Sequence, residues 1–133
     1  MFDEIKRLDR IFKAKSIAVV GASTNPEKTG HIIMKNILDG GFKGKIYPIN
    51  LKFCLGDIYI AVSVFIGVPI NKIDLIIIVV PAKFVSEVLE DAAKKQVTCA
   101  VIISGGFREA GNDDLEASVV ETAKKYGIRF IGP

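Results

Sequence analysis

Apolar and polar residues alternate along the chain in blocks that predict strands and helices in turn. Runs of consecutive apolar residues indicate strands buried on both faces, as in a parallel sheet covered by helices. Stretches with apolar residues three and four positions apart indicate helices that bury one face. The predicted strands are Ser16–Val20, Lys45–Ile49, Asp74–Val80, Val97–Ile103 and Ile128–Ile131, and the predicted helices are Phe2–Phe12, Thr29–Asp39, Lys83–Lys95 and one that begins near Asn112.

The apolar stripes of the helices identify the side chains expected to face the sheet. They are Ile33, Met34, Ile37 and Leu38, then Phe84, Val85, Val88, Leu89, Ala92 and Ala93, and finally Leu115, Val119, Val120 and Ala123. Strands that alternate with helices imply right-handed crossovers and an open parallel sheet. We therefore expect an α/β fold, a three-layer Rossmann-like sheet with helices on both faces, in one domain over residues 1–133.

Residues 51–70 are the atypical part of this domain. They are apolar without clean periodicity, and they predict only a strand near Ile58–Val62.

Composition excludes several classes of protein. The net charge is +3 and the Lys and Arg residues form no long stripe, which argues against nucleic-acid binding. No segment reaches the roughly 20 apolar residues of a membrane helix. The two cysteines, Cys54 and Cys99, lie far apart in the sequence, so we expect reduced thiols in a cytoplasmic protein. Neither cysteine has a second Cys or a His nearby, so we expect no metal site. Cys99 is expected to pack as a small apolar residue.

A polar loop bracketed by Gly21 and Gly30 joins the first strand to the following helix. Loop and helix N–H groups at such a junction point toward an anion, and the helix dipole favours negative charge there. The loop therefore predicts a phosphate seat for a nucleotide-like ligand. A plain strand-to-helix turn is the alternative.

Two departures from the usual dinucleotide pattern narrow the ligand. The loop lacks the G-x-G-x-x-G spacing, and the second strand ends in Asn50, followed by Lys52, where an acid would hold the ribose hydroxyls. A cation there would attract a phosphate on the sugar. This favours coenzyme A or NADP over NAD.

Four ordered motifs resemble the CoA-binding domain of ADP-forming acyl-CoA (acetyl-CoA) synthetases, which is related to the succinyl-CoA synthetase alpha subunit and to free-standing CoA-binding proteins. The motifs are Ser16-Ile-Ala-Val-Val-Gly-Ala-Ser, Gly41-Phe-Lys-Gly-Lys-Ile-Tyr-Pro-Ile-Asn, Asp74-Leu-Ile-Ile-Ile-Val-Val-Pro-Ala-Lys-Phe-Val and Ile103-Ser-Gly-Gly-Phe-Arg-Glu-Ala-Gly. The ending Tyr126-Gly-Ile-Arg-Phe-Ile-Gly-Pro is also similar. The resemblance covers nearly the whole chain outside residues 51–70.

The resemblance implies a role for each matched position. The CoA phosphates would lie among Gly21, Ala22, Ser23, Thr24, Lys28 and Gly30, and the adenosine and its phosphate near Asn50 and Lys52. The adenine or pantetheine would be flanked by Val80, Pro81 and Ala82, and the thiol arm would be bordered by Ser104, Gly105, Gly106 and Phe107.

The resemblance also limits what the chain does alone. One departure from the family is Leu51, which stands where the family commonly has Pro. A second concerns catalysis, because the synthetases carry their phosphorylated histidine in a second domain. His31, the single histidine, does not match it, so we expect CoA binding without catalytic residues, with further synthetase domains or subunits as partners.

Other interpretations stay open at this point. The chain could be a fragment of an NADP-binding oxidoreductase, although no proton donor is evident near the later strands. It could instead be a partner-binding module that has lost its ligand through residues 51–70. His31 could donate to a phosphate from the first helical turn, but a partly exposed helical residue is the simpler interpretation.

Overall fold

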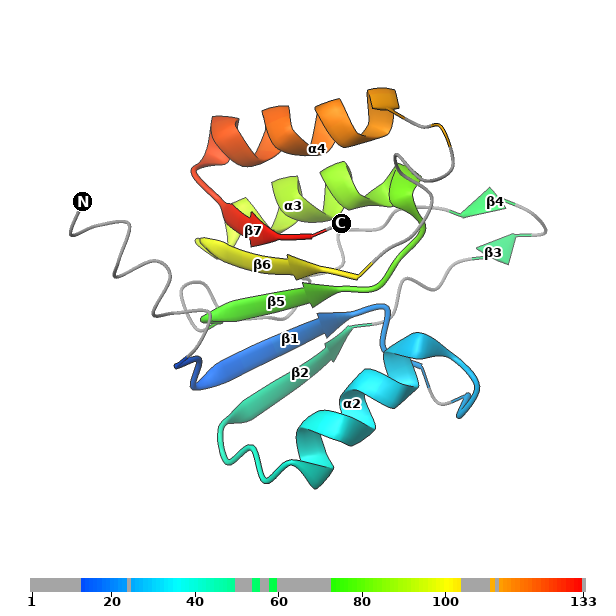
Figure 1. Ribbon diagram of the computed structural model, residues 1–133, viewed down its shortest axis with the longest axis vertical. Helices are drawn as coiled ribbons and strands as arrows, with labels where there is room; N and C mark the ends of the chain where they lie inside the picture. Colours follow the sequence, from blue (N-terminus) through cyan, green and yellow to red (C-terminus); the bar gives the residue numbers. More distant parts are fainter. Residues whose placement is uncertain are drawn as a thin grey trace.

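The main sheet has five parallel strands in the order β2-β1-β5-β6-β7 (Figure 1). The computed structural model describes residues 13–23, 25–49, 73–103, 111 and 113–132, and the backbone of 54–55 and 58–59. The strands are β1 (Ser16–Val20), β2 (Lys45–Ile49), β5 (Leu75–Ile78), β6 (Cys99–Ile102) and β7 (Arg129–Ile131). All five were predicted, while the predicted helix Phe2–Phe12 lies outside the described residues.

Helices cover both faces of this sheet. Figure 1 shows α2 (Thr29–Asp39) on one side, and α3 (Ala82–Lys94) and α4 (Asp113–Tyr126) on the other. This arrangement confirms the predicted three-layer α/β fold with an open parallel sheet.

The segment with no clean periodicity behaves differently. Cys54–Leu55 (β3) and Ile58–Tyr59 (β4) form a separate antiparallel pair. The strand predicted near Ile58–Val62 therefore begins where expected, but it pairs with β3 instead of joining the main sheet, and residues 60–62 lie outside the described residues.

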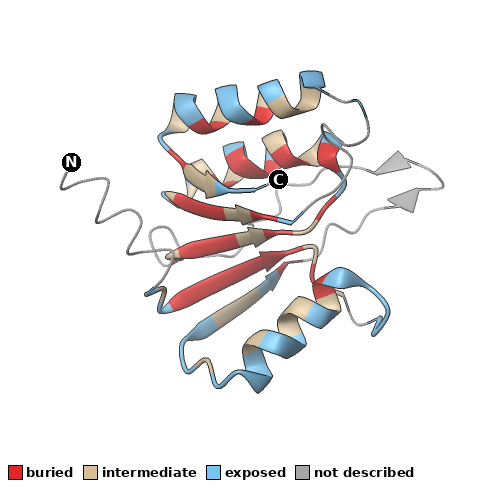
Figure 2. Cartoon of the chain, viewed as in Figure 1, coloured by how far each residue is buried: buried red, intermediate tan, exposed pale blue. Residues whose placement is uncertain are grey.

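Alternation along the strands divides the core into two layers. Ala18, Val20, Ile76 and Ile78 pack on the face covered by α3 and α4, while Ile17, Val19, Leu75 and Cys99 pack on the face covered by α2. Figure 2 shows that the central strands are buried and that the outer surface of α2 is exposed. Cys99 is fully buried in the layer under α2, which confirms its predicted packing.

Two predicted core residues are wrong. Leu38 is 59% exposed and Val120 is 36% exposed. Each follows a residue that does pack inward, Ile37 in α2 and Val119 in α4. One residue turns a helix by about 100°, which carries the second side chain past the contact with the sheet.

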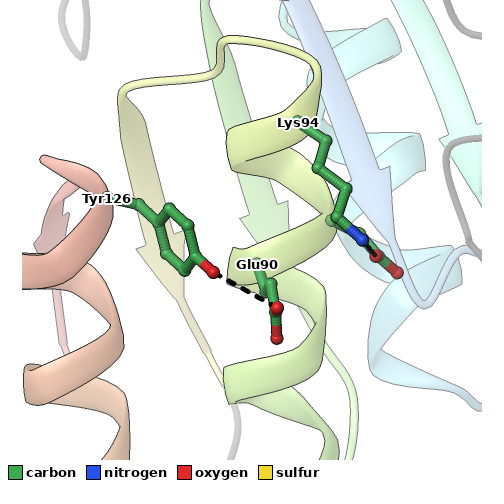
Figure 3. Close-up of polar contacts among 4 residues, drawn as sticks. Glu90, Lys94 and Tyr126 are labelled. Carbon is green, nitrogen blue, oxygen red and sulfur yellow. Dashed lines mark hydrogen bonds and ion pairs between the residues drawn. The ribbon is translucent and has the colours of Figure 1, made fainter.

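Polar contacts join α3 to α4 on the covered face. The hydroxyl oxygens of Ser86 and Ser118 are 3.0 Å apart. Near the other end of the pair, the Tyr126 hydroxyl donates to Oε1 of Glu90 over 3.2 Å (Figure 3). Within the described residues, no helix combines the length and apolar character needed to cross a membrane.

Candidate phosphate-binding site

The candidate site lies at the carboxyl ends of β1 and β5, where the strand order changes direction. From β1 the chain crosses to β2 on one side, and β5 pairs with β1 on the other. Open α/β sheets bind ligands at such a switch point. The contact between the two strands continues one residue past the end of β5, because the Val79 N–H donates to the carbonyl of Val20, the last residue of β1, over 2.8 Å.

Gly21 and Gly30 allow three segments to meet at this point. Gly21 has a φ of +102°, and a Cβ on it would overlap the carbonyl of Val79. A Cβ on Gly30 would overlap the carbonyl of Gly21. The loop after β1 is therefore pressed between the end of β5 and the first turn of α2, and both positions require glycine.

A cavity of about 290 Å³ opens beside these glycines. It is lined by Gly21, Ala22, Ser23, Lys28, Thr29, Gly30 and Val79. The structure thus brings together five residues that the sequence predicted for the phosphates. Thr29 and Val79 were missed, although each is adjacent in sequence to a predicted residue.

Two of the predicted loop amides are already used. The N–H groups of Gly21 and Ala22 both donate to the carbonyl of Ile49, over 2.8 and 3.1 Å. This pair of bonds ties the loop to the end of β2. It also removes these two amides from any contact with an anion, so Gly21 and Ala22 shape the wall of the cavity.

The first turn of α2 supplies amides in their place. Thr29 and Gly30 are the first two helical residues, and within the described residues their N–H groups have no acceptor. Amides at this position point out of the helix end. Lys28 precedes them as the N-cap residue, with an exposed side chain that makes no capping bond.

Charge distinguishes this helix end from that of α4. The first turn of α2 has no acidic residue, whereas the first turn of α4 contains Asp113, Asp114 and Glu116. Those carboxylates interact favourably with the positive end of the α4 dipole, as predicted for Asp113 and Asp114, and they would repel a phosphate. The combination of Lys28 with an acid-free first turn makes the start of α2 suitable for an anion.

The loop itself is held by short-range bonds. The Asn25 N–H donates to Oγ of Ser23 over 3.1 Å, and the Glu27 N–H donates to Oδ1 of Asn25 over 3.0 Å. The Lys28 N–H donates to the Asn25 carbonyl over 3.0 Å. Side-chain bonds of this kind stabilise tight turns.

His31 connects this loop to the helix. Its Nδ1 lies 2.9 Å from the Ser23 carbonyl oxygen, and its side chain is partly buried. The prediction of a partly exposed helical residue is confirmed, but the bond to Ser23 was not predicted. His31 lines a second cavity of about 550 Å³, together with residues that include Met34, Leu38 and Pro48.

Of the remaining predicted site residues, three lie in the described part of the chain at the start of α3, and the others do not. Val80 and Ala82 are buried in the core under α3 and α4, and Pro81 between them is exposed at the N-cap of α3. Thr24, Asn50, Lys52, Ser104, Gly105, Gly106 and Phe107 lie outside the described residues. In the described part of the chain, no cluster of His, Cys, Asp and Glu residues is suited to a metal ion.

Comparison with known proteins gives one family and several close relatives. The family described as a CoA binding domain matches residues 15–133. The alpha subunit of the ADP-forming acetate–CoA ligase I of Pyrococcus furiosus is 46% identical over 95% of this chain and 28% of its own length. The ADP-forming acetate–CoA ligase of Methanocaldococcus jannaschii is 48% identical over 90% of this chain and 16% of its own length.

A solved structure extends the comparison to the fold. The apo form of the dinucleotide-forming acetyl-coenzyme A synthetase 1 of Ca. Korarchaeum cryptofilum superposes with a TM-score of 0.79 at 44% identity. The match covers 95% of this chain and 27% of that one. The chain thus spans only a minor part, 28% or less, of the curated relatives named above.

Proposed function

The chain belongs to the CoA binding domain family, and from this premise we propose that it binds coenzyme A or an acyl-CoA, with the diphosphate at the start of α2. The observation that carries the proposal is the cavity beside Gly21 and Gly30, whose wall contains Lys28 and the helix amides of Thr29 and Gly30, which have no acceptor in the described part of the chain. A diphosphate supplies the acceptor oxygens that such amides need, and its charge is favoured by the lysine and the helix dipole.

The amides of Thr29 and Gly30 and the ammonium group of Lys28 are the proposed donors. Gly21 and Ala22 contribute shape, because the Ile49 carbonyl accepts both of their N–H groups. Pro81, exposed at the start of α3, is the proposed contact for the adenine or pantetheine. The roles of Asn50 and Lys52 at the adenosine, and of residues 104–107 at the thiol arm, remain predictions from the sequence.

We further propose that the chain acts as the CoA-binding part of an ADP-forming acyl-CoA ligase. The relatives named above are ligases of which this chain covers 28% or 16%. Acyl transfer would then depend on further synthetase domains or subunits, while residues 15–133 present the coenzyme.

Isothermal titration calorimetry with CoA, dephospho-CoA, NAD and NADP tests the proposal. We expect heat for CoA, a weaker response for dephospho-CoA if the sugar phosphate is contacted, and none for NAD. No heat for CoA beside clear binding of NADP would instead support the oxidoreductase interpretation.

Thermal melting provides an independent measurement. A ligand present at about 100 times its Kd stabilises the folded chain by roughly 2.7 kcal/mol, so the melting temperature should rise as CoA is added. An unchanged melting temperature at millimolar CoA would favour a partner-binding module without a nucleotide ligand.

A further inference from the structure

We infer that His31 is a positioning residue for the phosphate site and not a direct ligand of the phosphate. The inference rests on the proposed function, because it concerns how the same cavity is held in shape. It assigns the single histidine of the chain a role in fixing the Ser23 side of the cavity relative to α2.

The geometry assigns the proton on the ring. A carbonyl oxygen only accepts hydrogen bonds, so Nδ1 of His31 must donate across the 2.9 Å separation to the Ser23 carbonyl. The bond is partly buried and spans eight positions in the sequence. It is therefore a bond between the loop and the helix, distinct from the local bonds of the turn.

The same geometry argues against direct contact with the ligand. Nδ1 is already engaged by Ser23, and His31 is absent from the wall of the 290 Å³ cavity. It lines the 550 Å³ cavity instead, and Ala22 and Ser23 line both. The ring thus stands behind the Ser23 wall of the phosphate cavity.

The bond closes a ring of contacts around the loop. Ser23 is joined to Asn25 through its hydroxyl, Asn25 to Lys28 through its carbonyl, and Lys28 leads into α2. His31 returns from α2 to Ser23. Without it, the polar contact left to Ser23 among the described residues is the exposed bond from the Asn25 N–H.

This arrangement matters for binding because the two sides of the cavity come from different segments. Ser23 stands on the loop side, and Thr29 and Gly30 stand on the helix side. A donor set fixed before the ligand arrives loses less conformational freedom on binding. His31 therefore contributes to affinity without touching the ligand.

Two isosteric amides separate the ring nitrogens. In His31→Asn the side-chain NH2 lies near the position of Nδ1 and can still donate to Ser23, whereas in His31→Gln it lies near the position of Nε2. His31→Phe keeps the ring and removes both nitrogens. We expect His31→Asn to bind CoA like the wild type, and the other two variants to bind it about two- to tenfold more weakly, as for the loss of one hydrogen bond.

Hydrogen exchange of the ligand-free protein gives the second readout. The amides of Asn25 and Lys28 should exchange faster in His31→Phe and His31→Gln than in the wild type, and His31→Asn should restore protection. Equal exchange and equal CoA affinity in all four proteins, at unchanged melting temperatures, would overturn the inference and leave the proposed function standing. A wild-type chain that binds no CoA would overturn the proposed function, and the exchange rates would still decide whether His31 holds the turn.

Discussion

Gly30, in the first turn of α2, packs directly against the carbonyl group of Gly21 at the end of β1. A Cβ on Gly30 would overlap the oxygen and carbon of that carbonyl and lie 3.3 Å from Cα of Ala22. All of the crowded atoms belong to the backbone, so no side chain can rotate away. The close approach brings the start of the helix onto the loop and closes one side of the 290 Å³ cavity.

Gly30→Ala should destabilise the fold and distort the site together. We expect the free energy of unfolding to fall by about 1–3 kcal/mol, the usual range for an overpacked position. Urea denaturation measures it. Thr29→Ala is the matched control, because Thr29 is exposed in the same turn and the change keeps its backbone amide. Equal stability of the two variants would contradict the close approach.

Gly21→Ala combines two separable effects, backbone strain and overlap. Gly21 has a φ of +102° and lies against the Val79 carbonyl, whereas Gly127 has a φ of +70° with nothing within 4 Å of an added Cβ. Gly127→Ala should therefore show strain alone, about 1–2 kcal/mol. Gly21→Ala should lose more stability than that in the same urea titrations. A smaller loss at Gly21 would argue that β5 and the loop can move apart.

The strands could be predicted because consecutive apolar side chains indicate burial on both faces, and α2 because its apolar side chains are spaced to bury one face. Ser16–Val20 and Thr29–Asp39 have the bounds that the pattern predicted. The strand predicted over Asp74–Val80 is limited to Leu75–Ile78. The apolar run continues because Val80 is buried in the core just before α3, so apolar character here extends past the strand pairing.

The site could be predicted only as far as local spacing determines it. The glycines and Lys28 were identifiable because they lie in one loop between a strand and a helix. Two other contacts could not be predicted: the bonds from two loop amides to the Ile49 carbonyl, and the bond from His31 to Ser23. Both depend on how β2 and α2 pack on β1. These tertiary contacts decide which amides remain for a ligand.

The Ser86–Ser118 contact predicts coupling between α3 and α4. The two hydroxyl oxygens are 3.0 Å apart and partly buried, so either single change to Ala leaves one hydroxyl without this partner. We expect each single variant to lose about 0.5–1.5 kcal/mol of stability, and the double variant to lose less than the sum. Urea unfolding of the four proteins gives the coupling energy, and strictly additive losses would show that the hydroxyls act independently.

Lys28→Met should lower the affinity for CoA and make that affinity less sensitive to salt. The reason is that the proposed phosphate contact at the start of α2 includes one cationic side chain. For an exposed charge we expect a loss of about three- to tenfold in affinity, together with a shallower decline of affinity between low and high salt. Lys35→Met is the matched control, since Lys35 lies on the same helix but lines the other cavity. Calorimetry at two salt concentrations measures both effects. If Lys28→Met and Lys35→Met lower the affinity equally, the positive charge acts only as a general field and the phosphates do not lie at the start of α2.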